Sequence, residues 1–382
     1  VIEQRESSLL IDEKTWITVI SYAIKNEVTA MQKTDLFPGG NTTQGFFSYY
    51  DQILPHKDAN MIYCVKGGPG AGKSTFFKTL GKEFLEMGCD VEFLHCSSDN
   101  HSLDGILIKQ YRTLLVDGTA PHIVDPKNPG ASDIILHFGD FFNMAKLKEQ
   151  KDTILSLNKA IGQKFSRAYR YLRSAKEIYL DINNMYQNAF LHTNLKAISS
   201  NLNREIFADK KGKEEKERKM FLSAVTPGGL VNYLKETIQT PIIYQIKSHA
   251  GDCAPKLLES IRNEALKRDF SIETFYCPMD PDQKIDHLII KELGVSIVTS
   301  NQYHPYEGGN VIDLATCYAE PDKAEIRYNM EWMDTLIQKS VSVIREAKAL
   351  HDELEQCYVP NIDFEQINLL KDTVKEEILA NK

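Results

Sequence analysis

Short apolar runs alternate with amphipathic stretches over residues 45–143. Residues 62–65 have the pattern of a buried strand, and residues 74–87 after them have the pattern of a helix. Further apolar runs at residues 91–95 and 114–116 also indicate strands. Strands that alternate with helices in this way predict an α/β fold, with a parallel sheet and helices on both of its faces.

Two longer segments carry apolar residues at spacings of three and four, which is the pattern of an amphipathic helix. The first spans residues 144–207, and the second follows residue 320. We expect each helical tail to cover its own domain, although a coiled-coil dimer stays open and would make the protein a homo-oligomer. Near the N-terminus, one helical face is expected from Ile11, Trp16, Ile17 and Ile20.

The strongest motif lies between the first strand and the first helix. Residues 67–74 read Gly-Gly-Pro-Gly-Ala-Gly-Lys-Ser, which matches the G-x-x-x-x-G-K-[ST] pattern of P-loops. Its glycines let backbone N–H groups surround phosphate oxygens, and the helix N-terminus adds partial positive charge. Lys73 should reach the β- and γ-phosphates, and the Ser74 hydroxyl should ligate Mg²⁺. The predicted nucleotide-binding residues are Gly68, Pro69, Gly70, Ala71, Gly72, Lys73, Ser74 and Thr75.

The chain repeats this region at an offset of 181 residues, which pairs Lys66 with Lys247. The helical tails repeat as well, at an offset of 172 residues that pairs Lys176 with Lys348. A repeat of this length is the size of a domain, so the sequence predicts a tandem duplication.

The second copy lacks the residues that would bind phosphate and metal. Lys73, Ser74 and Asp117 of the first copy become Ala254, Pro255 and Thr299 in the second. Asp117 ends an apolar run, as a Walker B aspartate does, and its loss together with Lys73 and Ser74 favours one metal–nucleotide site. In the second loop, Asp252 would place negative charge where phosphate should lie. We therefore expect a degenerate second domain that keeps its strand, loop and helix but binds no nucleotide.

Some candidate residues survive in both copies, which favours a role in the architecture. Asp99 ends a strand beside the P-loop strand, where it could bind or deprotonate an acceptor hydroxyl, or cap a helix. Asp104 is a second candidate for the acceptor site, and His122 is either a local hydrogen-bonding residue or a base. We also expect Arg262 or Arg268 of the second domain to approach the first site.

Composition narrows the functional class. The chain has 382 residues and a formal net charge of −8, which argues against a nucleic-acid partner. It has no apolar run near the length of a membrane span, which is about 20 residues. Its 7 cysteines form no C-x-x-C pair, which fits reduced thiols in a cytoplasmic protein.

The repeat sets the expected domain boundaries. They are a lead-in at 1–44, a P-loop domain at 45–143, a helical hairpin and charged linker at 144–218, the degenerate domain at 219–320 and a helical tail at 321–382.

Residues 66–75, 95–99 and 117–122 resemble those of a bacterial family of tandem P-loop ATPase-like proteins. The resemblance covers about residues 45–320, and it implies ATP binding, a duplicated architecture and a cytosolic setting. In that family the second copy can also carry a P-loop, and residues 248–255 depart from that pattern.

Three functions remain open from the sequence. The first is a Mg²⁺-dependent ATPase in which hydrolysis drives a shape change of the two halves or their helical tails, with Lys73, Asp117 and Asp99 as catalytic residues. The second is a small-molecule or nucleotide kinase that uses Asp99 or Asp104 at the acceptor. The third is a non-catalytic ATP sensor that acts through its helices. No glutamate follows Asp117, so the Asp-Glu pair typical of many strong ATPases is absent.

Overall fold

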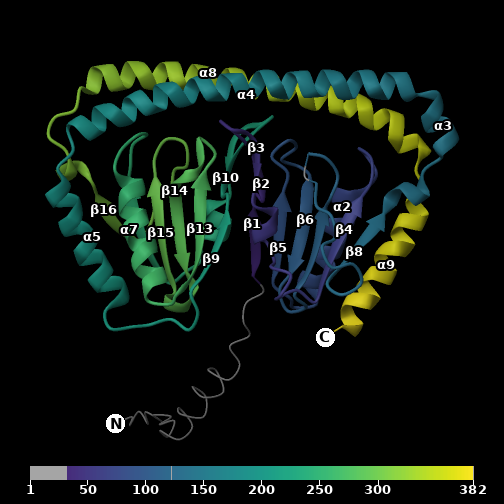
Figure 1. The fold of residues 1–382 in the computed structure, drawn as a ribbon, viewed down its shortest axis with the longest axis horizontal. Helices are drawn as coiled ribbons and strands as arrows, with labels where there is room; N and C mark the ends of the chain where they lie inside the picture. Colours follow the sequence, from purple (N-terminus) through teal and green to yellow (C-terminus); the bar gives the residue numbers. More distant parts are fainter. Residues whose placement is uncertain (1–31, 122, 382) are drawn as a thin grey trace, which may run out of the picture. The chain divides into compact units, whose positions relative to one another are not determined.

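Within the unit that spans Lys33 to Lys382, two six-stranded sheets and their helices make an α/β fold (Figure 1). The structure is a computed structural model that describes residues 32–121 and 123–381. The helical face expected at Ile11, Trp16, Ile17 and Ile20, and the candidate His122, lie outside the described residues. None of the described helices combines the length and the apolar character that a membrane crossing requires.

The first sheet has the strand order β1-β5-β6-β7-β4-β8. Its strands are β1 (Lys33–Leu36), β4 (Met61–Lys66), β5 (Val91–His95), β6 (Leu103–Ile108), β7 (Thr113–Asp117) and β8 (Asp133–His137). The side chains of β4 alternate between two core clusters. Tyr63 and Val65 pack in the cluster with helix α2 (Lys73–Glu86), and Ile62 and Cys64 pack in the other. Burial on both faces explains why β4 is an unbroken apolar run.

The second sheet repeats this order as β9-β13-β14-β15-β12-β16. Its strands are β9 (Lys216–Met220), β12 (Ile242–Lys247), β13 (Ser271–Cys277), β14 (Asp280–Ile290), β15 (Val295–Ser300) and β16 (Asn310–Asp313). Each half also has a small antiparallel hairpin, made by β2 (Gly39–Thr42) with β3 (Gly45–Ser48) and by β10 (Ser223–Thr226) with β11 (Gly229–Asn232). The repeated strand order is compatible with the expected duplication.

Both sheets are mixed, whereas we expected parallel sheets. Between Lys73 and Asp117 there are two strands rather than the one expected, and β6 runs antiparallel to both β5 and β7. Residues 96–102 and 109–112 form the two connections of β6, and segments this short reverse the chain. A parallel pair would need a crossover of roughly a dozen residues or more. β14 is likewise antiparallel to β13 and β15.

The two halves share one hydrophobic core that contains side chains from both sheets. Within this core Phe37 and Phe221, both fully buried, exchange two backbone hydrogen bonds with N···O distances of 3.0 and 3.1 Å. The face of the first sheet opposite α2 belongs to this core, where Tyr50 and Ile53 also pack. The halves are therefore joined through buried apolar side chains and not only through a linker.

The helical tails are exchanged between the halves. The long helices α4 (Lys151–Asn188) and α8 (Lys323–Tyr358) run antiparallel and side by side (Figure 1), with Ser340 Oγ donating to Ala168 O at 3.1 Å. The helices that follow them, α5 (His192–Phe207) and α9 (Phe364–Ala380), pack on α7 (Ala254–Lys267) and α2 respectively. The expectation that each tail covers its own domain was therefore wrong. The apolar face of α4, for which we left open a dimer, contacts α8 of the same chain.

The exchange follows from helix length. The 38 residues of α4 give a helix about 57 Å long at about 1.5 Å per residue. Such a helix extends past a single sheet. The remaining helices are short: α3 (Met144–Glu149), α6 (Leu234–Thr237) and the 3₁₀ turns Tyr50–Gln52, Phe138–Phe141, Lys291–Leu293, Ala315–Cys317 and Val359–Asn361.

Candidate nucleotide site

The glycine-rich loop connects β4 to α2, as the motif predicted. Gly70 and Gly72 have φ angles of +65° and +82°, a left-handed conformation that glycine adopts without strain. The Lys73 ammonium lies within its own loop, where it donates to Gly67 O at 2.9 Å and to Gly68 O at 3.0 Å.

The end of β7 lies against this loop because β7 pairs in parallel with β4. Asp117 Oδ2 is 3.5 Å from Lys73 Nζ, and Asp117 Oδ1 accepts the Thr119 N–H at 2.8 Å. The Thr119 hydroxyl donates to Gly67 O at 2.9 Å, and this hydrogen bond connects the segment after β7 to the glycine-rich loop. The structure thus brings together Lys73 and Asp117, which are 44 positions apart in the sequence. Thr119 lies in the segment 117–122 that carried the resemblance, but it was not named as a site residue.

The donor set beside the loop fits a Mg²⁺ ion. Ser74 offers a hydroxyl oxygen and Asp117 a carboxylate, which are the hard oxygen ligands that Mg²⁺ prefers. Ser74 Oγ accepts the Leu103 N–H at 3.0 Å, which orients this hydroxyl from β6. A bound Mg²⁺ would neutralise phosphate charge. Of the other predicted loop residues, Ala71 is buried, Pro69 is half-buried and Thr75 is exposed on α2.

Asp99 takes part in a tight turn between β5 and β6. Its carboxylate accepts the His101 N–H and the Ser102 hydroxyl, both at 3.0 Å, and pairs with Lys348 of α8 at 3.3 Å. Although burial opposes ionisation, the His101 N–H and Lys348 hold the pKa of Asp99 below its usual value. No helix begins after Asp99, so the helix-cap alternative was wrong. Asp104 is buried and accepts the Tyr50 hydroxyl at 2.7 Å.

The same arrangement of Asp99 recurs in the second half. Lys176 of α4 pairs with Asp280 at 2.8 Å, and these residues match Lys348 and Asp99 in the two repeat alignments. A contact present in both halves, only one of which has Lys73 and Ser74, supports an architectural role for Asp99. In each half, this lysine–aspartate contact attaches the exchanged helix to the half that it covers.

The junction of α8 and α9 covers the glycine loop, a contact that the sequence did not indicate. A Cβ atom built on Gly68 would lie 2.6 Å from Tyr358 Cε1, and one built on Gly70 would lie 2.8 Å from Val359 Cγ2. A Cβ on Gly72 would be 3.3 Å from Phe364 Cε1. We call residues 355–364 the elbow. The repeat of the helical tails was the one available indication that the elbow matters, since Tyr358 pairs with Tyr186 at the offset of 172.

The second loop binds its own carboxylate. Asp252 is buried, and it accepts the His249 N–H at 2.6 Å and the Ala254 N–H at 2.9 Å. Burial raises the pKa of Asp252, while these N–H groups oppose the rise. The Cys253 N–H donates to the Tyr318 hydroxyl, and Pro255 lies in the first turn of α7. The strand, loop and helix persist here, as we expected.

Arg262 and Arg268 do not approach the first loop, so that expectation was wrong. Arg262 Nε donates to Glu217 at 2.7 Å, and Arg268 Nε donates to Glu264 at 2.6 Å. These guanidinium groups belong to ion pairs on the second half, because α7 faces its own sheet and α5.

Protein-family models, curated proteins and solved structures give no match to this chain. Its function is therefore inferred from the site itself.

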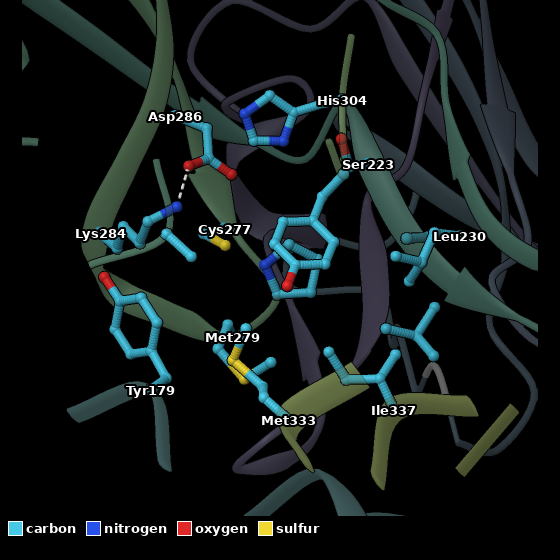
Figure 2. Close-up of a pocket in the computed structure, with 15 residues that line it drawn as sticks. Tyr179, Ser223, Leu230, Cys277, Met279, Lys284, Asp286, His304, Met333 and Ile337 are labelled. Atoms are coloured by element: carbon cyan, nitrogen blue, oxygen red, sulfur yellow. Dashed lines mark hydrogen bonds and ion pairs between the residues drawn. The ribbon is translucent and has the colours of Figure 1, made fainter. Parts of the chain in front are cut away.

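A hollow lies beside the degenerate loop (Figure 2), with a volume of about 640 Å³ that includes space open to solvent. Its walls are mostly apolar, and its polar groups include Lys284, Asp286 and Tyr179. Lys284 donates to Asp286 in the view of Figure 2, and this partner raises the pKa of Lys284 even though burial opposes the rise.

Asp286 also lies within metal-binding distance of His287 and His304. Nδ1 of His287 accepts the Thr299 N–H at 3.2 Å, and Nε2 of His304 lies 2.8 Å from the Thr299 hydroxyl and 3.1 Å from Asn301 Nδ2. One nitrogen of each ring is therefore already held by the protein, and Asp286 is paired with Lys284. We assign no metal to this cluster.

Proposed function

We propose that this protein is an ATPase with one Mg²⁺–nucleotide site at residues 67–74, and that its second loop is a degenerate copy. The observation that carries the proposal is the carboxylate of Asp252 in the second loop. It supports the view that a loop at this position of the repeat presents backbone N–H groups to an anion, as phosphate-binding loops do. The first loop has Ala71 at the matching position, together with Lys73 and Ser74.

The elbow supports coupling between the nucleotide and the exchanged helices. Tyr358, Val359 and Phe364 all pack on glycines of the first loop. A phosphate chain that binds to this loop changes the surface on which the elbow rests. Because α8 lies along α4, a displaced elbow would be transmitted to the other half. Hydrolysis would then drive a shape change between two positions of the tails.

The same contacts favour one alternative, a non-catalytic ATP sensor in which binding alone moves the elbow. A kinase has less support, because Asp99 and Asp104 are held by the Lys348 and Tyr50 contacts. Product analysis separates the three. An ATPase releases phosphate, a sensor binds without turnover, and a kinase places phosphate on an acceptor.

Calorimetry with ATP and Mg²⁺ tests the site. We expect one nucleotide per chain, and we expect Lys73→Ala to weaken binding about 10- to 150-fold, since a charged hydrogen bond contributes about 1.5–3 kcal/mol. Lys82→Ala is the matched control, because its side chain lies on the same helix with 76% of its surface exposed. Two bound nucleotides, or unchanged affinity in Lys73→Ala, would contradict the proposal.

The metal assignment has its own readout. Ser74→Ala and Asp117→Asn should lower phosphate release more than they lower nucleotide binding without metal, because both residues act through Mg²⁺. Full turnover by Asp117→Asn would remove Asp117 from the site.

A further inference from the structure

Helix α8 brings an acidic side chain from the second half of the chain to the first loop. A Cβ atom on Gly70 would lie 3.3 Å from Glu355 Cβ and 3.5 Å from Glu355 Cγ. The Glu355 carboxylate is 3.6 Å from Nδ1 of His351, which is one helical turn earlier. Among the described residues, that buried nitrogen has no hydrogen-bond partner. Glu355 therefore lies at the loop together with an imidazole nitrogen that still has bonding capacity.

The second loop has the same helix packing without these two groups. At the offset of 172, Tyr179 and Asn183 of α4 take the places of His351 and Glu355. Asn183 Nδ2 donates to Gly251 O at 2.9 Å, so it occupies the equivalent position over the degenerate loop. Figure 2 shows Tyr179 beside Lys284, where both line the hollow next to the degenerate loop.

The two halves thus act as a control for each other. The lysine–aspartate contacts of the exchanged helices, Lys348 with Asp99 and Lys176 with Asp280, occur in both halves. The histidine and the glutamate occur only over the loop that keeps Lys73 and Ser74. Because the histidine and the glutamate are present only where the predicted phosphate-binding residues are present, we connect them with the chemistry of the first site.

We infer that Glu355 is the general base of the first site, supplied by the second half of the chain and positioned by His351. This inference rests on the proposed ATP hydrolysis. Glu355 takes a proton from the attacking water, whose oxygen forms a bond to the γ-phosphorus. The bond from that phosphorus to the bridging oxygen breaks, and its electron pair remains on the ADP product. Glu355 then passes this proton to the departing phosphate or to solvent water, which returns its carboxylate to the ionised form.

This assignment fills a gap in the motif. No glutamate follows Asp117, so the first half lacks the carboxylate that often follows a Walker B aspartate. A base on α8 is in place only while the exchanged helix covers the loop. The rate of ATP hydrolysis would therefore depend directly on whether α8 covers the loop.

The charges around the pair favour a base over a metal site. His351, Asp352 and Glu355 lie close enough together to hold a cation. Lys348 donates to Asp352, however, and its ammonium also faces Asp99, so a positive charge is already present there. Burial and Lys348 lower the pKa of His351, although Glu355, Asp352 and Asp99 oppose this. A neutral His351 can share a hydrogen with Glu355 without adding charge.

Paired measurements of turnover and binding test the inference. Glu355→Gln should lower kcat about 100-fold or more, which is the range of a lost general base, with KM and ATP affinity changed less than about twofold. Glu355→Asp should restore part of the rate, since it keeps the carboxylate. His351→Gln should lower kcat less and shift the acid limb of the pH–rate profile. Asn183→Ala, the matched position over the degenerate loop, should leave kcat unchanged.

The outcomes separate this inference from the proposed function. If the wild-type protein binds no nucleotide, the proposed site itself fails. If it binds ATP and releases phosphate, but Glu355→Gln turns over within about threefold of it, only the inference fails. A wild-type protein that binds ATP without turnover would also overturn the inference. A melting temperature close to wild type, measured for each variant, shows that a lost rate is not lost folding.

Discussion

Arg218 is the residue whose removal most directly tests how the two halves are joined. It extends from β9 of the second half, and its Nη2 lies 2.5 Å from Glu92 Oε2 of the first half. Its Nη1 lies 3.2 Å from Glu273. Burial alone would raise the pKa of Glu92, but Arg218 and Lys109 hold it below its usual value. The side chain of Glu92 is only 1% exposed, so its charge depends on these cations.

We expect Arg218→Met to lower the free energy of unfolding by about 3–5 kcal/mol, which is the range for removing one partner of a buried ion pair. The lower half of that range is expected, because Lys109 still lies 3.1 Å from Glu92 and Lys291 lies 2.7 Å from Glu273. The double variant Arg218→Met with Glu92→Gln should recover part of the loss, since it removes the carboxylate that lacks a cation.

Urea unfolding followed by circular dichroism measures this effect. Lys82→Met is the control, because the pair of Lys82 with Glu86 is exposed and should contribute less than about 1 kcal/mol. Because the halves share one core, unfolding should be a single transition whose midpoint moves as a whole. A loss for Arg218→Met no larger than that for Lys82→Met would refute this reasoning.

Two further predictions concern the elbow and acid stability. Gly68→Ala should lower the free energy of unfolding by about 1–3 kcal/mol because its methyl group overpacks against Tyr358, and Tyr358→Ala should suppress that loss. Gly162 on α4 has open space around it, so Gly162→Ala should instead raise the free energy of unfolding by about 0.5–1 kcal/mol. Equal stability of the two glycine variants in urea would argue against the elbow contact. Burial lowers the pKa of His304 to about 4, so between pH 6.5 and 4 the unfolded chain binds a proton that the folded chain does not. The free energy of unfolding should therefore fall by about 3 kcal/mol as the pH drops to 4. A His304→Asn variant with the same pH dependence of unfolding would contradict this.

The first loop and its strand and helix could be predicted from the sequence because they are local. The glycines, Lys73 and Ser74 follow one another, and the apolar run before them needs burial on both faces wherever it lies. Pro255 likewise predicted a helix start in the second half, since proline fits the first turn of a helix.

The strand β6 shows where local pattern was insufficient. Its direction depends on the turns at its two ends, one of which is closed by Asp99 through the His101 N–H. The sequence pattern there was equally compatible with a helix cap. The choice between them was settled by pairing with β5 and β7, which lies outside the local segment.

The sequence by itself determined that one half keeps the residues of a P-loop motif and the other lacks them, because those residues are contiguous and the repeat compares them directly. Only the tertiary structure decided which helix lies over each loop. Glu355 and Tyr358 are nearly 300 positions from Gly68 and Gly70, and their contact depends on the packing of α8 along α4 and on the core shared at Phe37 and Phe221. The apolar spacing predicts that a helix buries one face, but it does not identify the surface that the face packs against. That surface is set by the packing of many side chains that are distant in the sequence.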